Sequence, residues 1–201
     1  MNPKVVGLTG GMASGKSYVR SVFEDLDIPC IDCDVVARNI HQDPTHIAMG
    51  EISVAFPSAM TPDGRLATAL MRDILGNDPT ANARLQAILT PHLREYLAAW
   101  TAAQDAPYVV WESAILIESG AKVDRLLVVD VDTEVQMKRI HARNPDWTDT
   151  QIQTMLGLQM DRAVRLGAAT DVVFNNKTPH FARSQVLAIH HNYLELWAVH
   201  A

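Results

Sequence analysis

Four residues near the start of the chain have the types and the spacing of a phosphate-binding site. Gly10, Gly15, Lys16 and Ser17 occupy the fixed positions of the pattern G-x-x-x-x-G-K-[ST]. Glycines let successive backbone N–H groups turn toward phosphate oxygens. A lysine supplies a mobile positive charge for the β- and γ-phosphates, and a serine hydroxyl can bind Mg²⁺. Residues 10–17, called the phosphate loop below, therefore predict binding of a nucleoside triphosphate with Mg²⁺.

The segments on both sides of the phosphate loop have the patterns that this chemistry requires. Residues 5–9 are mostly apolar and uncharged, which predicts a short buried strand. Residues 18–26 repeat apolar side chains at helical spacing, and the start of such a helix would point at bound phosphates. Ala13 stands where a fourth glycine is often found, so we expect it to keep a negative φ. A glycine-rich turn without a ligand is the alternative interpretation.

Two carboxylates follow a second predicted strand, which begins at Ile28 and ends in Asp32 and Asp34. In a parallel α/β sheet the carboxyl ends of the strands face the ligand crevice, so these acids should lie near the phosphate loop. Strand alternation would direct both to one side if the strand extends that far. Asp34 can accept a proton in catalysis, or it can cap a helix that begins at Val35. We favour catalysis because of the phosphate loop upstream.

A third predicted strand, residues 108–112, is buried and ends in Glu112. A phosphate-loop protein places such an acid near Mg²⁺, often through a water molecule. For Glu112, and for Glu118 after it, a surface-facing side chain is the alternative.

Composition limits the class of protein. The 201 residues carry a net charge of −6, and 48% are hydrophobic, which fits one α/β domain with an inserted or appended part. The acidic balance argues against a general nucleic-acid binder or a binder of anionic membranes. Without a transmembrane-length apolar run or a signal peptide, we expect a cytoplasmic protein. Cys30 and Cys33 are spaced as C-x-x-C, but no second pair exists, which favours buried inert thiols over a redox or zinc site.

A helical pattern extends from Thr45 to Gln104. The pairs Asp78-Pro79 and Thr90-Pro91 each predict a helix start, with an N-cap residue followed by proline. This run is longer than a crossover between strands needs, so we expect a helical insertion that holds a second substrate. Plain crossover packing is the alternative.

The last third of the chain predicts two more strands, residues 125–130 and 172–174, with basic helices between them. One helix covers residues 133–143. Residues 148–151 match a capping box for another helix, which we expect to carry Arg162 and Arg165 on one face. These helices predict a mobile lid over the nucleotide, with a solvated helix face as the alternative. A final helix is predicted from about Pro179 to near Val199.

In this order, these residues resemble the dephospho-coenzyme A kinase family of small P-loop kinases over almost the whole chain. The segments that carry the resemblance are Leu8–Gly11, Ser14–Ser17, Ile31–Arg38, Asp63–Leu66, Leu116–Glu118, Gln136–Arg143, Gln159–Arg165 and Val172–Asn175. The resemblance implies a three-layer α/β P-loop NTPase fold in one kinase domain, residues 1–201. A five-stranded parallel sheet would carry a helical acceptor-binding region, residues 35–104, and a lid, residues 139–166.

The resemblance also implies the reaction: ATP phosphorylates the ribose 3′-hydroxyl of dephospho-coenzyme A in the last step of coenzyme A synthesis. The implied catalytic residues are Lys16, Asp34, Arg139 and Arg143. The implied ATP-binding residues are Gly10, Gly11, Ala13, Ser14, Gly15, Lys16, Ser17, Tyr18 and Asn175. The implied Mg²⁺ ligands are Ser17, Asp32 and Glu112. We expect no nucleic-acid or membrane partner, and a monomer or weak homo-oligomer.

Three residues depart from the family pattern. Thr68 replaces an arginine, Thr90 replaces a histidine, and Thr170 replaces an aspartate before the fifth strand. The first two lie in the predicted acceptor-binding region and therefore bear on acceptor affinity. The alternative functions are a kinase for another small molecule, such as a nucleoside monophosphate, and a non-catalytic nucleotide sensor. Asp34 argues against a sensor, because a protein that only binds nucleotide needs no acid at an acceptor.

Overall fold

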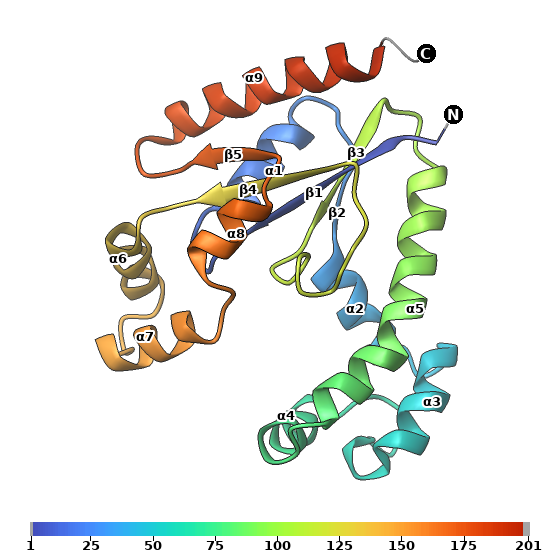
Figure 1. The fold of residues 1–201 in the computed structure, drawn as a ribbon. Helices are drawn as coiled ribbons and strands as arrows, with labels where there is room; N and C mark the ends of the chain where they lie inside the picture. The colour runs from blue at the N-terminus through green and yellow to red at the C-terminus, as the bar shows by residue number, and fades with distance from the viewer. Residues whose placement is uncertain (1, 199–201) are drawn as a thin grey trace. The chain divides into compact units, whose positions relative to one another are not determined.

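A computed structural model describes residues 2–198 of the chain. Its centre is a five-stranded sheet in the order β2-β3-β1-β4-β5 (Figure 1). The strands are β1 (Lys4–Gly10), β2 (Cys30–Asp32), β3 (Tyr108–Glu112), β4 (Arg125–Asp130) and β5 (Asp171–Phe174). β1 pairs in parallel with β3 and β4, and β4 pairs in parallel with β5. The end of β1, which leads into the phosphate loop, therefore lies beside the carboxyl ends of β3 and β4.

The chain divides into two compact units. The first contains the residues up to Ile31 and those from Ala103 onward, and the second is Asp32–Ala102.

The first unit is a helix–sheet–helix arrangement. On one face, α1 (Lys16–Glu24) and α9 (Pro179–Ala198) pack against each other, and their apolar side chains join those of the strands in one core. Val6 and Leu8 of β1 are fully buried in this core. Gly7, between them, points to the other face, where Leu116 occupies the space that a side chain would need. The predicted end of the last helix near Val199 lies outside the described residues.

The connection from β4 to β5 consists of three helices: α6 (Thr133–Arg143), α7 (Asp149–Gly157) and α8 (Arg162–Ala168). A right-handed crossover places them on the sheet face opposite α1, and α8 packs against β4. The predicted capping box at Thr148 and Gln151 is confirmed. The prediction that the same helix carries Arg162 and Arg165 is wrong. The Asp161 side chain accepts hydrogen bonds from the amides of Ala163 and Val164, and this N-cap starts a separate helix.

The second unit is helical: α2 (Cys33–Gln42), α3 (Ile47–Ala55), the 3₁₀ turn η1 (Pro57–Ala59), α4 (Thr68–Asn77) and α5 (Ala81–Ala102). The prediction of a helix start at Thr90-Pro91 is wrong, because Pro91 lies inside α5. Buried Leu85, Leu89 and Leu97 continue one apolar stripe across the proline, and α5 packs against α2, α3 and α4. This packing outweighs the local cost of a proline in a helix interior, about 3 kcal/mol.

None of the described helices is both long enough and apolar enough to span a lipid bilayer.

Candidate nucleotide-binding site

The phosphate loop begins where β1 ends and closes on itself through the hydrogen bond from Ser14 N to Gly11 O, 3.2 Å. Gly15 is the N-cap of α1 and has φ 97° and ψ 27°, a backbone conformation that glycine adopts without strain. Ala13 has φ 56°, so the expected negative φ is wrong. The reason lies outside the loop. Arg139 and Asn175 donate to the carbonyls of residues 13 and 14, and these bonds hold the backbone in that turn.

The Lys16 ammonium curls back over the loop, with Nζ 2.9 Å from Gly10 O and 3.3 Å from Gly11 O. Ser14 is 1% exposed, and its hydroxyl is buried without a hydrogen-bond partner among the described residues. A buried polar atom without a partner costs free energy, so a ligand that bonds to it is favoured. A lysine and an unsatisfied hydroxyl at one turn fit the oxygens of a phosphate group.

Ser17 and Glu112 bring two oxygen donors together at the start of α1, with Ser17 Oγ 3.4 Å from Glu112 Oε1. Glu112 is 5% exposed, so the surface-facing alternative is wrong for this residue, whereas Glu118 is exposed. Arg20 Nη1 lies 3.0 Å from Glu112 Oε2 and compensates the buried charge. Hydroxyl and carboxylate oxygens are the ligands that Mg²⁺ prefers, so this pair fits the predicted metal.

Asp32, the third predicted metal ligand, is the N-cap of α2. Its Oδ1 accepts hydrogen bonds from Asp34 N at 3.0 Å and Val35 N at 3.1 Å. The capping role considered for Asp34 is therefore wrong, because Asp32 performs it. β2 ends at Asp32 and Asp34 lies in the first turn of α2, so the two acids do not share strand alternation. Both residues belong to the second unit, and their roles toward Mg²⁺ and acceptor stay predictions.

Arg139 and Asn175 brace the phosphate loop from α6 and from the end of β5. The Arg139 guanidinium donates to Ser14 O at 3.3 Å and Asn175 O at 2.7 Å, and Asn175 Nδ2 donates to Ser14 O at 2.7 Å. Arg143 is exposed in the last turn of α6. Tyr18, predicted to bind ATP, donates its hydroxyl to Pro179 O at 2.9 Å and so connects α1 to α9. The structure thus brings Arg139 and Asn175 onto the loop, and it leaves Arg143 at the surface.

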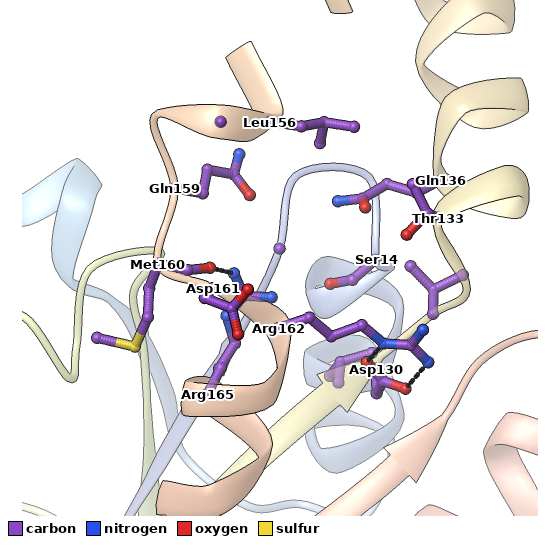
Figure 2. A pocket seen from close by; sticks show the side chains of 14 residues that line it. Ser14, Asp130, Thr133, Gln136, Leu156, Gln159, Met160, Asp161, Arg162 and Arg165 are labelled. Atoms are coloured by element: carbon purple, nitrogen blue, oxygen red, sulfur yellow. Dashed lines mark hydrogen bonds and ion pairs between the residues drawn. The ribbon is translucent and has the colours of Figure 1, made fainter. Parts of the chain in front are cut away.

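A cavity of about 270 Å³ opens beside the loop, between the end of β4 and the segment that joins α7 to α8 (Figure 2). Its floor includes Gly11 and Ser14. The Met12 peptide is held from above: Gln136 Nε2 donates to Met12 O at 2.6 Å, and Met12 N donates to Gln159 Oε1 at 2.9 Å. The two glutamines therefore cover part of the cavity beside the phosphate loop and line it with polar groups.

The wall of this cavity contains a charge cluster that the sequence reasoning missed. Asp130 is 3% exposed and accepts two hydrogen bonds from Arg162, from Nε at 2.8 Å and from Nη2 at 2.6 Å. Arg162 Nη2 also lies 2.8 Å from Asp132 Oδ1. The hydrogen bonds to Asp130 and Asp132 raise the pKa of Arg162 above its usual value, against the opposing effect of burial. Asp130 is the last residue of a predicted strand, as Glu112 is. That shared position is the sequence signal that could have identified Asp130 as a site residue.

Neither Cys30 nor Cys33 forms a disulfide bond within the described residues. Cys33 is buried and Cys30 is half-buried. Burial, together with the nearby Glu24 carboxylate, raises the pKa of the Cys30 thiol to about 12. The reactive thiolate is therefore almost absent at neutral pH.

The three departures from the family pattern lie in different places. The Thr170 hydroxyl accepts from Leu126 N at 2.7 Å and donates to Leu126 O at 3.0 Å, at the amino end of the sheet, away from the phosphate loop. Thr68 begins α4, and Thr90 lies within α5. Near Thr90, His92 Nε2 lies 2.9 Å from Glu51 Oε1. Their effect on acceptor affinity stays a prediction.

Comparisons with known proteins agree on one family. A family model described as dephospho-CoA kinase matches residues 4–180. Dephospho-CoA kinase of Hahella chejuensis is 37% identical over 195 residues, which cover 96% of this chain and 93% of that protein. Dephospho-CoA kinase of Burkholderia pseudomallei is 38% identical over 195 residues, which cover 94% of this chain and 95% of that protein.

Solved structures match the fold. A Thermus thermophilus crystal structure has a TM-score of 0.85 at 24% identity and covers 96% of this chain and 99% of its own. Dephospho-CoA kinase from Campylobacter jejuni has a TM-score of 0.62 at 16% identity, with coverage of 96% and 98%. Shikimate kinase from Bacteroides thetaiotaomicron has a TM-score of 0.55 at 14% identity, with coverage of 94% and 97%. The predicted fold class, a P-loop α/β fold with a five-stranded parallel sheet, is confirmed.

Proposed function

The chain belongs to the dephospho-CoA kinase family, and on that premise we propose that it transfers the γ-phosphate of ATP to the ribose 3′-hydroxyl of dephospho-coenzyme A, which gives coenzyme A and ADP. The site observation that supports this most directly is the phosphate loop. Lys16 Nζ lies on the loop carbonyls, and the Ser14 hydroxyl is buried without a partner. Both observations support binding of the oxygens of a triphosphate.

In this proposal the phosphate loop binds the β- and γ-phosphates through its backbone N–H groups and Lys16. The bond between the γ-phosphorus and the oxygen that bridges it to the β-phosphate breaks, and its electron pair stays with ADP. The ribose hydroxyl oxygen forms the new bond to phosphorus, and its proton passes to Asp34. Proton acceptance of this kind is worth about 10²- to 10⁴-fold in rate. Lys16 contributes more in the transition state, because negative charge shifts toward the bridging oxygen there.

Ser17 and Glu112 would hold Mg²⁺, whose charge neutralises the phosphate oxygens during transfer. Arg20 keeps Glu112 in place through the contact at 3.0 Å. Arg139 and Asn175 would keep the loop in its binding conformation before ATP arrives, which lowers the entropic cost of binding. We further propose that the protein acts in the cytoplasm.

A panel of acceptors tests the proposed function. The purified protein is incubated with ATP, Mg²⁺ and one of dephospho-coenzyme A, AMP, CMP or shikimate, and products are identified by mass spectrometry. ³¹P NMR then distinguishes a 3′-phosphate from a 2′-phosphate. We expect the highest kcat/KM with dephospho-coenzyme A and a product phosphorylated at the 3′ position. The variant Lys16→Ala, assayed in parallel, excludes a contaminating kinase. Faster turnover of AMP, CMP or shikimate would contradict the proposal.

A further inference from the structure

The two arginines of α8 serve different partners. Figure 2 shows Arg162 extending to Asp130, while Arg165 extends toward Met160. Arg165 Nη2 donates to Met160 O at 2.6 Å, and its other guanidinium nitrogens have no carboxylate partner among the described residues. Arg162, in contrast, is occupied by Asp130 and Asp132. Arg165 is therefore the arginine of this cavity whose charge is not neutralised by an acid.

Arg165 reaches the backbone of the phosphate loop. A Cβ atom built on Gly11 would lie 3.0 Å from Arg165 Nη1 and 2.8 Å from Gln136 Nε2. Lys16 Nζ approaches the same residue from the loop side, 3.3 Å from Gly11 O. Two cationic groups thus lie near Gly11. An oxygen of a phosphate bound by Lys16 at this point would lie within reach of the Arg165 guanidinium, which is suited to binding two phosphate oxygens at once.

α8 is too short to hold Arg165 in place by itself, since it has only seven residues. The position of α8 is determined by two hydrogen bonds from Arg162 to the buried Asp130 carboxylate. Asp130 belongs to β4 of the central sheet. Arg162 and Arg165 are three residues apart, so they project from one side of the helix. The bond between Arg162 and Asp130 therefore determines where the Arg165 guanidinium lies.

We propose that Arg165 is a catalytic residue that binds the transferring phosphoryl group, and that Arg162 and Asp130 are positioning residues that hold α8 over the phosphate loop. This assignment rests on the proposed function and deepens it. As the bond to the bridging oxygen breaks, its electrons go to ADP. The acceptor oxygen forms the new bond and loses its proton to Asp34, while Arg165 stabilises the charge on the equatorial oxygens. Arg139 differs, because its guanidinium bonds to loop carbonyls and to Asn175 O.

The first experiment compares Arg165→Ala with Arg183→Ala, a matched control on α9. Arg183 is another arginine of the first unit; it forms an ion pair with Asp25, and its side chain is 39% exposed. We expect Arg165→Ala to lower kcat by about 10²- to 10³-fold with little change in ATP affinity, and Arg183→Ala to leave both unchanged. Guanidinium ion in the millimolar range should restore part of the lost kcat. If Arg165→Ala does not fold, as judged by circular dichroism, Arg165→Lys carries the test.

The second experiment does not need the acceptor. Binding of ADP with Mg²⁺ and aluminium fluoride, a mimic of the transferring phosphoryl group, is compared with binding of ADP and Mg²⁺ alone. Arg165→Ala should lose affinity for the fluoride complex and keep that for ADP. This comparison is informative even if dephospho-coenzyme A proves to be the wrong acceptor, so failure of the proposed function and failure of the Arg165 assignment are separable.

A double-mutant cycle tests the positioning role of Arg162. Arg162→Ala should lower kcat in the wild-type background and have almost no further effect in Arg165→Ala, because the group that it positions is then absent. A purely structural role would lower kcat equally in both backgrounds and would overturn the positioning assignment. The assignment of Arg165 is overturned if Arg165→Ala keeps kcat within threefold of wild type, or if it loses ADP and fluoride-complex affinity equally.

Discussion

Replacement of Gly15 by alanine should destabilise the protein by more than backbone strain alone. Gly15 has φ 97°, and an alanine in the left-handed region costs about 1–2 kcal/mol. The new Cβ would also collide with Asn175 Nδ2, which donates to Ser14 O at 2.7 Å. Asn175 is 7% exposed, and a buried polar group that loses its partner costs about 1–3 kcal/mol. We therefore expect a loss of about 2–5 kcal/mol in the free energy of unfolding.

Gly120 provides the matched control. It has φ 62°, and a Cβ there would meet nothing within 4 Å, so Gly120→Ala carries the backbone strain without the collision. Urea unfolding of both variants isolates the collision, which we expect to be about 1–3 kcal/mol. Isothermal titration calorimetry should show ATP binding at least about tenfold weaker for Gly15→Ala, which corresponds to a loss of about 1.4 kcal/mol in the free energy of binding. ATP binding by Gly120→Ala should be unchanged.

A second substitution tests the cause. Adding Asn175→Ala to Gly15→Ala removes the atom that the new Cβ meets, so the double variant should be more stable than the sum of the two single losses predicts. Equal losses of stability for Gly15→Ala and Gly120→Ala, together with unchanged ATP affinity, would refute the argument that Asn175 packs against the loop.

Three further predictions concern single side chains. Lys16→Ala should abolish turnover and leave the circular dichroism spectrum unchanged, because the ammonium acts on the phosphoryl group; a near wild-type kcat/KM would remove the loop from catalysis. Asp34→Asn should lower kcat by about 10²- to 10⁴-fold with unchanged ATP affinity, since Asp32 and not Asp34 caps α2; a kcat within threefold of wild type would leave the base unidentified. Tyr193→Phe removes a hydrogen bond of 2.7 Å to Asp171 and should cost about 1.5–3 kcal/mol at pH 7. Burial raises the pKa of Asp171, but hydrogen bonds from Arg125 and Tyr193 outweigh burial and hold this pKa below its usual value. The stabilisation from these bonds is therefore present above pH about 3.9 and is lost as the pH falls through the lower folded pKa. The deficit of Tyr193→Phe in urea unfolding should therefore shrink in acid, and a deficit independent of pH would contradict this linkage.

The elements near the phosphate loop were predictable because their signals are local. The loop pattern, the apolar strand before it and the helix after it lie within residues 4–24. β3, β4 and α6 also have the predicted bounds, since each is a continuous apolar run or a periodic pattern between clear turn signals. A capping box such as the one at Thr148 needs only four consecutive residues.

Two local predictions proved wrong because distant contacts outweigh a local preference. Pro91 remains inside α5 because leucines on both sides of it are buried against neighbouring helices. Ala13 adopts a positive φ because residues 139 and 175 hold the carbonyls around it. A third prediction failed for a local reason: Asp32 caps α2 in place of Asp34, because β2 ends at Asp32, two residues earlier than predicted.

The sequence by itself predicted which residues would bind a phosphate, because Gly10, Gly15, Lys16 and Ser17 form a recognisable pattern within residues 10–17. Only the tertiary structure decided what surrounds that loop. Gln136 and Gln159 hold Met12 from more than 120 residues away in the sequence, and Arg162 binds Asp130 across the β4-to-β5 connection. The physical reason is that a hydrogen bond is made by whichever groups the packing of α6, α7 and α8 brings within about 3 Å. No local propensity of the chain contains that information.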